Sequence, residues 1–345
     1  MLCEDLSNCN IRNLCDMINQ KRLVWADSLK GILIVLVVLG HSIQYSLMDG
    51  CYEDHVWNYI YSFHMPAFVA VSGFLSYRKS IVNDRFSIIY RRFKQLLVPY
   101  LLWELVHFSL QDNYTLSSLW NIFLHPYFWF LWVLFFIIVS FQCGDYLSEK
   151  LEIRQDVIIL GLCFLFAALM VLGEIRIMGF QFIAYYFMFY AIGYFIHKYP
   201  WFVVQSNGFF LVLTVIWIFM AYYWNMHELP FFLKNLPLPS SALQYSYRFF
   251  TGFIAVYILL GWSPKLFDNN TFWNVPFVSL GKISLGIYVI HLLLIPYIVN
   301  LVEVSTKSLG VTIGLSFIIA LTISSIIVWL IRKNRILAKL FLGKI

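Results

Sequence analysis

Charged residues are scarce in this sequence. Of its 345 residues, only 12% are Asp, Glu, Lys or Arg, whereas 61% are hydrophobic. An ordinary soluble domain carries about 25% charged residues, and no water-soluble fold of this size could bury so much apolar surface. The shortage of polar and charge-rich segments also excludes a largely disordered chain. We therefore expect an integral membrane protein.

We expect neither a cleaved signal peptide nor a metal site formed by cysteines. The first 20 residues are polar, with Glu4, Asp5 and Asp16, and lack the basic-then-apolar order of a cleaved signal peptide. The first span is therefore expected to act as an uncleaved anchor. The six cysteines lack the paired spacing of a metal site, so we expect no bound metal. They are Cys3, Cys9, Cys15, Cys51, Cys143 and Cys163.

Long apolar runs predict the fold class. A spanning helix needs about 20 apolar residues, because each residue rises ~1.5 Å across a hydrocarbon core of ~30 Å. The runs are continuous rather than alternating, which favours helices over membrane-spanning strands. We predict an all-α, polytopic membrane protein with about ten transmembrane helices. The expected spans are 29–47, 57–77, 93–111, 127–143, 157–173, 180–197, 201–224, 247–263, 277–300 and 310–331.

The positive residues orient these spans. With the N-terminal tail in the cytoplasm, the inner segments hold 20 of the 24 Lys and Arg residues, as the positive-inside rule predicts. Both termini are then cytoplasmic, and the net charge of +6 reflects topology rather than nucleic-acid binding. We expect a polar tail over 1–24, a membrane domain over 25–331 and a basic tail over 332–345. The proline-rich segment 225–246 is predicted to be an irregular outer loop.

Five ionisable side chains fall inside the predicted spans, at similar depths of ~14–21 Å from the inner face. Ionisable groups are costly in a bilayer and indicate function by default, although a neutral histidine can also simply hydrogen-bond between helices. A histidine at that depth can take a proton from a hydroxyl or carry an acyl group itself, and the residues alone do not choose between these roles. We expect the five side chains to share a cavity. They are His41, His64, Glu104, His107 and His291.

The densest group of positive charge precedes and opens the third predicted span. Topology and contact with anionic lipid explain Arg78, Lys79 and Arg85. The next three cations are placed below Glu104 and His107, where they can face the mouth of a cavity: Arg91, Arg92 and Lys94. Arginine suits bidentate phosphate contact and lysine supplies a point charge. This group therefore favours a phosphate-bearing donor that arrives from the cytoplasm.

Five stretches in order along the chain resemble the acyltransferase-3 family of membrane acyltransferases. The first is the run from Arg22 to Gly31 that continues to Gly40-His41-Ser42. The others are Phe63-His64-Met65-Pro66 with Ser72-Gly73-Phe74, the run from Arg91 to Tyr100, Trp129-Phe130-Leu131-Trp132, and the run from Leu280 to Tyr288 that ends at His291. The resemblance spans about residues 21–331 and is nearest to the branch named for fucose 4-O-acetyltransferases.

This resemblance implies transfer of acyl groups, commonly acetyl from acetyl-CoA, to hydroxyls of surface polysaccharides or related glycans at the outer side of the membrane. His41 takes the place of the family's essential histidine. Lys30 and Lys94 stand where many members have Arg, which keeps the charge but loses the planar fork. Asp27 matches an acidic position of the family and is expected to pair with Lys30.

The predicted site residues fall into three groups. The catalytic candidates are His41, Glu104, His64 and His291. The donor-binding candidates are Lys30, Arg91, Arg92 and Lys94. The acceptor-binding candidates are Asp27, His107, Trp129 and Trp132.

The predicted function is an O-acyltransferase of the bacterial inner membrane, with acetyl-CoA as donor, a glycan as acceptor and His41 as general base or transient acyl carrier. The alternative is a transporter that exports a glycan or small acid, because transporters also collect charge at mid-depth. A third hypothesis is a scaffold protein in a glycan-assembly complex, although a scaffold would have no need for buried histidines. The ordered stretches and the basic group favour transfer.

Overall fold

The computed structural model describes residues 23–77, 85–111, 124–172, 177–203, 206–267, 274–306 and 308–344. Within these ranges the secondary structure is helical and no strand occurs. Two predictions concern residues outside the described ranges: most of the N-terminal tail, and the cations Arg78 and Lys79.

A helix occupies each range that was expected to span the membrane. These helices are α2 (Val24–Leu47), α3 (His55–Ser76), α5 (Val98–Ser109), α7 (Trp129–Lys150), α8 (Gln155–Leu172), α9 (Phe180–Lys198), α10 (Asn207–Tyr222), α11 (Ser240–Phe267), α12 (Asn274–Ser305) and α13 (Leu309–Lys333). Among the described helices, α2, α7, α11, α12 and α13 are long and apolar enough to cross a membrane. The all-α membrane fold is therefore confirmed, whereas the count of ten spans and the side of the termini remain predictions.

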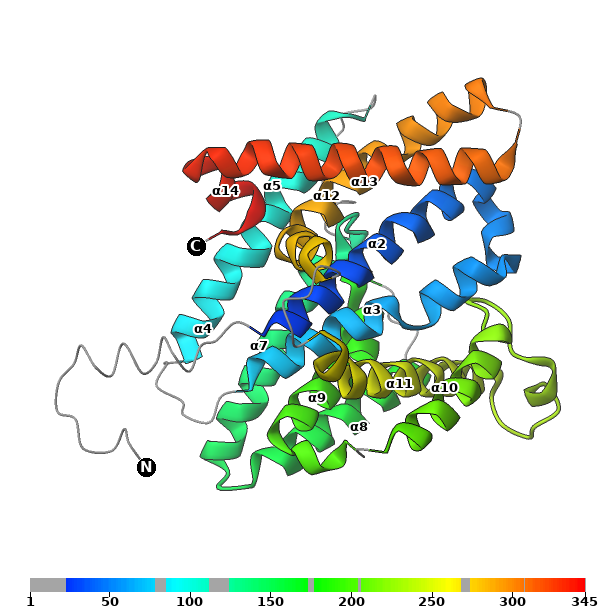
Figure 1. The fold of residues 1–345 in the computed structure, drawn as a ribbon. Coiled ribbons are helices and arrows are strands. Elements are labelled where there is room, and N and C mark those ends of the chain that lie inside the picture. Colours follow the sequence, from blue (N-terminus) through cyan, green and yellow to red (C-terminus); the bar gives the residue numbers. More distant parts are fainter. Residues whose placement is uncertain are drawn as a thin grey trace.

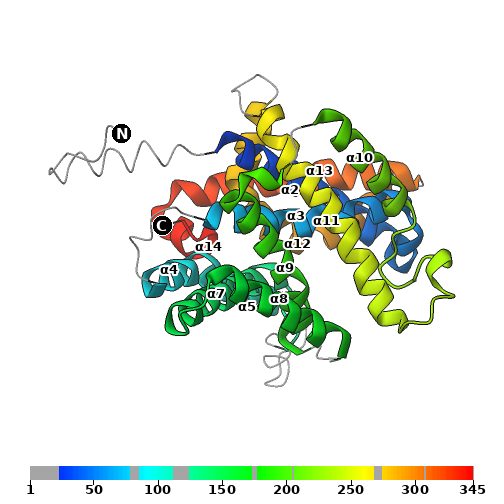
Figure 2. The ribbon, with the colours of Figure 1, turned by 90° about the horizontal axis from the view of Figure 1, so that it is seen from below.

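Helix α12 lies at the centre of the bundle, between α2 and α13 (Figure 1). Helix α3 packs against α2 on one side and against α9 and α11 on the other. Helices α7, α8 and α9 pack on one another as a neighbouring group, drawn in shades of green (Figure 2). Helix α2, which carries His41, thus packs directly on both α3 and α12.

Helices α2 and α12 approach unusually closely because each presents a glycine at the contact. A Cβ on Gly31 would collide with the backbone carbonyl of Phe277, and a Cβ on Gly281 would collide with that of Asp27. Small residues allow this close packing of helix backbones in membranes. Lys30 directly precedes Gly31, and Lys282 directly follows Gly281. The contact therefore fixes the positions of these two lysines relative to each other.

Two features of the fold depart from the sequence predictions. Phe93–Leu97, the beginning of the third expected span, is a π-helix between α4 (Arg85–Arg92) and α5. Helix α11 begins at Ser240, inside the segment predicted to be an irregular loop, because Pro239 is the last of the three prolines that interrupt that segment. The irregular part of the segment therefore ends near Pro239.

The C-terminal segment folds back against the bundle as α14 (Arg335–Leu342), beside α5 (Figure 1). The Asn334 side chain caps this helix by accepting from the backbone nitrogens of Ile336 and Leu337. The Trp103 indole N–H of α5 donates to the Phe341 carbonyl at 2.8 Å. Gly343 then adopts a φ of +60°, and a Cβ there would collide with the Gln95 carbonyl. These contacts hold the segment against the start of the third expected span.

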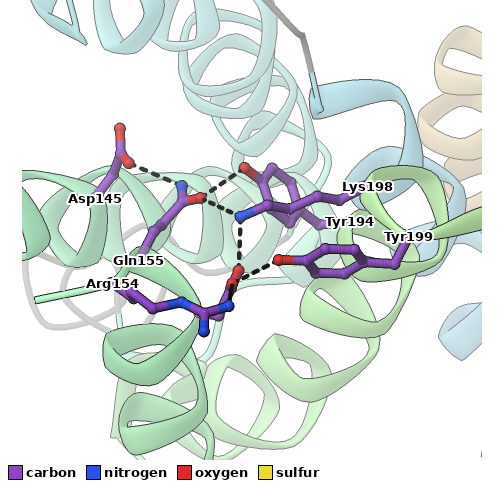
Figure 3. Close-up of polar contacts among 7 residues, drawn as sticks. Asp145, Arg154, Gln155, Tyr194, Lys198 and Tyr199 are labelled. Carbon is purple, nitrogen blue, oxygen red and sulfur yellow. Dashed lines mark hydrogen bonds and ion pairs between the residues drawn. The ribbon is translucent and has the colours of Figure 1, made fainter.

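A polar network joins α7, α8 and α9 at one end of the bundle (Figure 3). Asp156 at the start of α8 accepts from Lys198 Nζ and from the Tyr199 hydroxyl, both at 2.6 Å. The neighbouring Gln155 amide donates to Asp145 of α7 at 2.8 Å. Burial alone would raise the pKa of the Asp156 carboxyl, but the hydrogen bonds from Lys198 and Tyr199 outweigh it and hold the pKa below its usual value.

Candidate active site

Three of the four predicted catalytic side chains meet in one cluster. His41 of α2 and His291 of α12 lie edge to face, with ring centroids 5.2 Å apart. Tyr61 of α3 completes the cluster, since its ring centroid is 6.1 Å from that of His41 and 4.7 Å from that of His64. The fold therefore brings His41, His64 and His291 together around a tyrosine that the sequence analysis did not single out.

All three imidazoles are oriented by the backbone of their own helix. Nδ1 of His41 lies 3.2 Å from the Val37 carbonyl, and Nδ1 of His64 and of His291 each lies 2.7 Å from the carbonyl one turn earlier. A carbonyl oxygen can only accept, so the hydrogen of a neutral ring is assigned to Nδ1. This tautomer leaves Nε2 with a free lone pair, which is the state that a general base needs.

His41 differs from its two partners in accessibility. His64 and His291 are 2% and 0% exposed, whereas His41 is only partly buried. Nε2 of His291 has no hydrogen-bond partner among the described residues. Of the three residues, only His41 keeps an appreciable part of its surface exposed.

Glu104 and His107 form a second group around Tyr127. The carboxylate Oε1 of Glu104 accepts from the backbone nitrogen of Phe128 at 2.9 Å, at the start of α7. Its Oε2 lies 4.0 Å from His107 Nδ1, and the His107 ring stacks on Tyr127 with centroids 4.0 Å apart. A carboxylate at a helix N-terminus is favoured by the helix dipole. These contacts favour a positioning role for Glu104 at the start of α7.

The Tyr127 hydroxyl stands between the two groups. It donates to the Leu292 carbonyl at 2.9 Å and lies 3.2 Å from the Tyr45 hydroxyl. Tyr45 is one turn beyond His41 on α2, and Leu292 directly follows His291. The expected single cavity for all five ionisable residues is thus resolved into two adjoining groups that Tyr45 and Tyr127 connect.

A cavity of about 380 Å³ lies next to the histidine cluster, although none of its three histidines is among the described residues that line it. Three cations from different helices line one end of it: Lys30 of α2, Arg92 of α4 and Lys282 of α12. Its walls are mainly apolar, and the lining reaches Val37 on α2 and Tyr288 on α12. Val37 is one turn before His41, about 6 Å along the helix axis, and Tyr288 is three residues before His291.

Two of the four predicted donor-binding residues line this cavity. Lys30 and Arg92 line it, whereas Arg91 and Lys94 are absent from its lining. Instead, Lys94 Nζ lies over the Tyr90 ring, 4.1 Å from its centroid. The expected pair between buried Asp27 and Lys30 is present, with an N–O distance of 2.9 Å.

The sequence analysis did not name Lys282 as a donor-binding candidate, although Lys282 lies in the family-like run from Leu280 to Tyr288. Its position offered a signal, because Lys282 precedes His291 on α12 much as Lys30 precedes His41 on α2. Both lysines line the cavity about two to three helical turns before a clustered histidine.

The two tryptophans predicted to bind the acceptor pack against other parts of the bundle. The Trp132 indole N–H donates to the Met178 carbonyl at 2.9 Å, and the Trp129 ring packs on Phe182 and Tyr186 of α9. Neither tryptophan lines the cavity, although Phe130 between them does. Their observed contacts hold the beginning of α7 against α9 and the segment before it.

The amino-acid sequence matches a known protein family over most of its length. The sequence pattern of the acyltransferase-3 family, described as an acyltransferase domain, matches residues 23–331. The chain therefore belongs to this family, and its long apolar helices are those of an integral membrane protein.

Two curated relatives are similar over part of the chain. Nodulation protein NolL of Mesorhizobium japonicum is 34% identical over 141 residues, which are 36% of each chain. Nodulation protein NolL of Sinorhizobium fredii is 38% identical over 95 residues, which are 27% of this chain and 26% of the relative. The matched stretches thus span about a third and a quarter of these relatives.

Proposed function

We propose that this protein is an O-acetyltransferase of the bacterial inner membrane that transfers acetyl from cytoplasmic acetyl-CoA to a hydroxyl of a cell-surface glycan. The observation that carries the proposal is the cavity of about 380 Å³, which has three cations at one end and reaches to within one helical turn of His41.

The cavity suits a donor with an anionic head and an uncharged arm. Lys30, Arg92 and Lys282 offer positive charge where phosphate groups would bind, and Arg92 adds a fork for bidentate contact. The apolar walls suit the arm that carries the thioester toward His41. The positive-inside rule places the cationic end at the cytoplasm, where acetyl-CoA is found.

His41 is proposed as the general base. As the acceptor oxygen attacks the thioester carbonyl, Nε2 of His41 takes the hydroxyl proton and the carbon–sulfur bond breaks. The departing thiolate then receives that proton from the imidazolium, which restores the neutral ring. In the variant mechanism, Nε2 attacks the thioester carbonyl and the thiolate leaves; the acceptor hydroxyl then attacks the acetyl group, the bond to Nε2 breaks, and the hydroxyl proton goes to the thiolate.

Tyr61 and Val37 support the role of His41, because they hold the ring by its other nitrogen. The Tyr61 hydroxyl donates to Gln44 Oε1 at 2.7 Å, so its oxygen is left to accept from His41 Nδ1, 3.3 Å away. Because the tautomer is fixed, His41 is already in the state that accepts a proton at Nε2. The ring does not need to rearrange before proton transfer.

Thermal unfolding of the detergent-purified protein tests donor binding. Acetyl-CoA at 100 times its Kd should stabilise the folded protein by about 2.7 kcal/mol, while acetate at the same concentration should not. A transporter of glycans or small acids has no reason to bind acetyl-CoA, so an unchanged unfolding temperature would contradict the proposal.

Comparison of cells with and without the intact gene tests the acceptor. Ester-bound acetate released from the surface glycan by mild alkali should fall when the gene is disrupted and return when it is restored. Restoration by a His41→Ala protein that inserts normally would refute both versions of the mechanism.

A further inference from the structure

A second, smaller cavity lies beyond the histidine cluster. Its volume is about 120 Å³, and it lies between the end of α5, Tyr127 and the later part of α12. His107, Gln111, Tyr127 and Tyr297 supply its polar groups, and the rest of its lining is apolar.

The two cavities lie on opposite sides of the histidine cluster along two helices. On α2, Val37 lines the larger cavity, His41 follows one turn later, and Tyr45 follows one turn after that. Tyr45 meets the Tyr127 hydroxyl at 3.2 Å, and Tyr127 lines the smaller cavity.

The same order repeats on α12. Tyr288 lines the larger cavity, His291 comes three residues later, and Leu293 lines the smaller cavity. The contact between the Tyr45 and Tyr127 hydroxyls thus joins the lining of the smaller cavity to the helical turn that follows His41.

The charges of the two cavities differ. Three cations line the larger cavity, whereas no Lys, Arg, Asp or Glu is found among the described residues that line the smaller one. An anionic donor is favoured in the first, and an uncharged hydroxyl compound in the second. At about 120 Å³, the smaller cavity has room for part of one sugar ring and not for an oligosaccharide.

We propose that the smaller cavity binds the uncharged sugar residue that accepts the acyl group, with the Tyr45 and Tyr127 hydroxyls as the passage to His41. This assignment rests on the proposed O-acetyltransferase function. His107 and Gln111 would then hydrogen-bond ring hydroxyls, and the apolar walls would pack on the ring face.

A blocking substitution tests this site. Gln111→Trp fills the cavity from an exposed position, and Val304→Trp is the matched control because Val304 is 90% exposed on α12 and lines neither cavity. In cells, the Gln111→Trp protein should lower glycan-bound acetate at least 10-fold, while the control keeps the wild-type level. Both purified variants should still be stabilised by acetyl-CoA.

The outcomes separate the two proposals. Wild-type acetylation by the Gln111→Trp protein would overturn the assignment of the smaller cavity and leave the proposed function standing. Loss of acetyl-CoA stabilisation in that variant would show that it disturbs the donor side, and would also overturn the assignment. If the wild-type protein neither binds acetyl-CoA nor acetylates glycan, the proposed function fails and the assignment falls with it.

A second measurement tests the preference for an uncharged acceptor. Purified protein with labelled acetyl-CoA should acetylate methyl galactopyranoside at least 10-fold faster than the corresponding methyl galacturonoside. Equal rates, or a preference for the uronate, would overturn the neutral-sugar part of the proposal.

Discussion

The His41 and His291 rings meet edge to face with their centroids 5.2 Å apart, although 250 residues separate them in the sequence. Each ring is held at Nδ1 by a carbonyl of its own helix, and only His41 is partly exposed. The pair therefore combines one accessible imidazole with one buried neighbour.

We expect His41→Ala to reduce kcat by about 10²- to 10⁴-fold, because proton transfer to a positioned base contributes that much. The KM for acetyl-CoA should change little, since the cations of the larger cavity are untouched. The measurement is acetyl transfer by purified protein. His55→Ala is the control, because His55 is exposed at the start of α3; an equal loss in both variants would argue against a special role for His41.

Substitution of Glu104 distinguishes positioning from acid–base chemistry. In Glu104→Gln the amide oxygen can still accept from the Phe128 nitrogen, so activity should stay within a few-fold of wild type. In Glu104→Ala the loss of this hydrogen bond should cost about 1–3 kcal/mol of unfolding free energy. A Gln variant that is stable but inactive would instead assign Glu104 to the chemistry, as the sequence analysis predicted.

The donor-side cations should act on KM rather than kcat. Lys282→Ala and Arg92→Ala should each raise the KM for acetyl-CoA by about 10- to 100-fold, since a hydrogen bond to a charged group contributes about 1.5–3 kcal/mol. Arg91→Ala should have a smaller effect, because Arg91 does not line the cavity. Steady-state kinetics over a range of acetyl-CoA concentrations would measure this, with exposed Lys150→Ala as control; a larger effect at Arg91 would contradict the geometry.

The contact between α2 and α12 predicts a strong effect of one methyl group. Gly281→Ala places a Cβ against the Asp27 carbonyl and should destabilise the protein by about 1–3 kcal/mol, the usual cost of overpacking. Gly310→Ala and Gly314→Ala are matched controls, because nothing lies within 4 Å of the added Cβ at either position. Thermal unfolding in detergent compares the three variants, and equal unfolding temperatures would disprove the close approach.

The network around Asp156 predicts a loss of stability in acid. Its carboxyl pKa is below the usual value when the protein is folded, so its contribution to stability is present above a pH of about 4 and is lost as the pH falls through the folded pKa. Asp156→Asn should lower the unfolding temperature at neutral pH and weaken its decline below pH 4. Unfolding scans from pH 3 to 7 would reveal this; an unchanged decline would assign the acid sensitivity to other carboxyls.

The helices could be predicted from the sequence because long apolar runs leave few alternatives in a membrane. The sequence did not indicate which of Arg91, Arg92 and Lys94 lines the larger cavity. A regular helix carried through Phe93–Leu97 would orient these side chains differently from the π-helix that is present, and composition does not reveal such a change in winding.

The depth of a residue in the membrane was also easier to predict than the direction in which its side chain points. Glu104 was placed in the same band as the histidines, but its carboxylate turns to the start of α7, where the unpaired backbone nitrogens of a helix attract it. We did not predict Tyr45, Tyr61 and Tyr127 as site residues, because tyrosines in an aromatic-rich membrane chain resemble ordinary packing residues. Only their hydroxyl contacts in the folded protein distinguish them.

The folded-back C-terminal segment has a practical consequence for anyone who handles this protein. Leu342 and Gly343 belong to the wall of the larger cavity, so a purification handle or fluorescent reporter fused after Ile345 would be tethered within a few residues of the proposed donor entrance. Poor turnover by such a fusion would then report an obstructed entrance, while the imidazole chemistry deeper inside stayed intact.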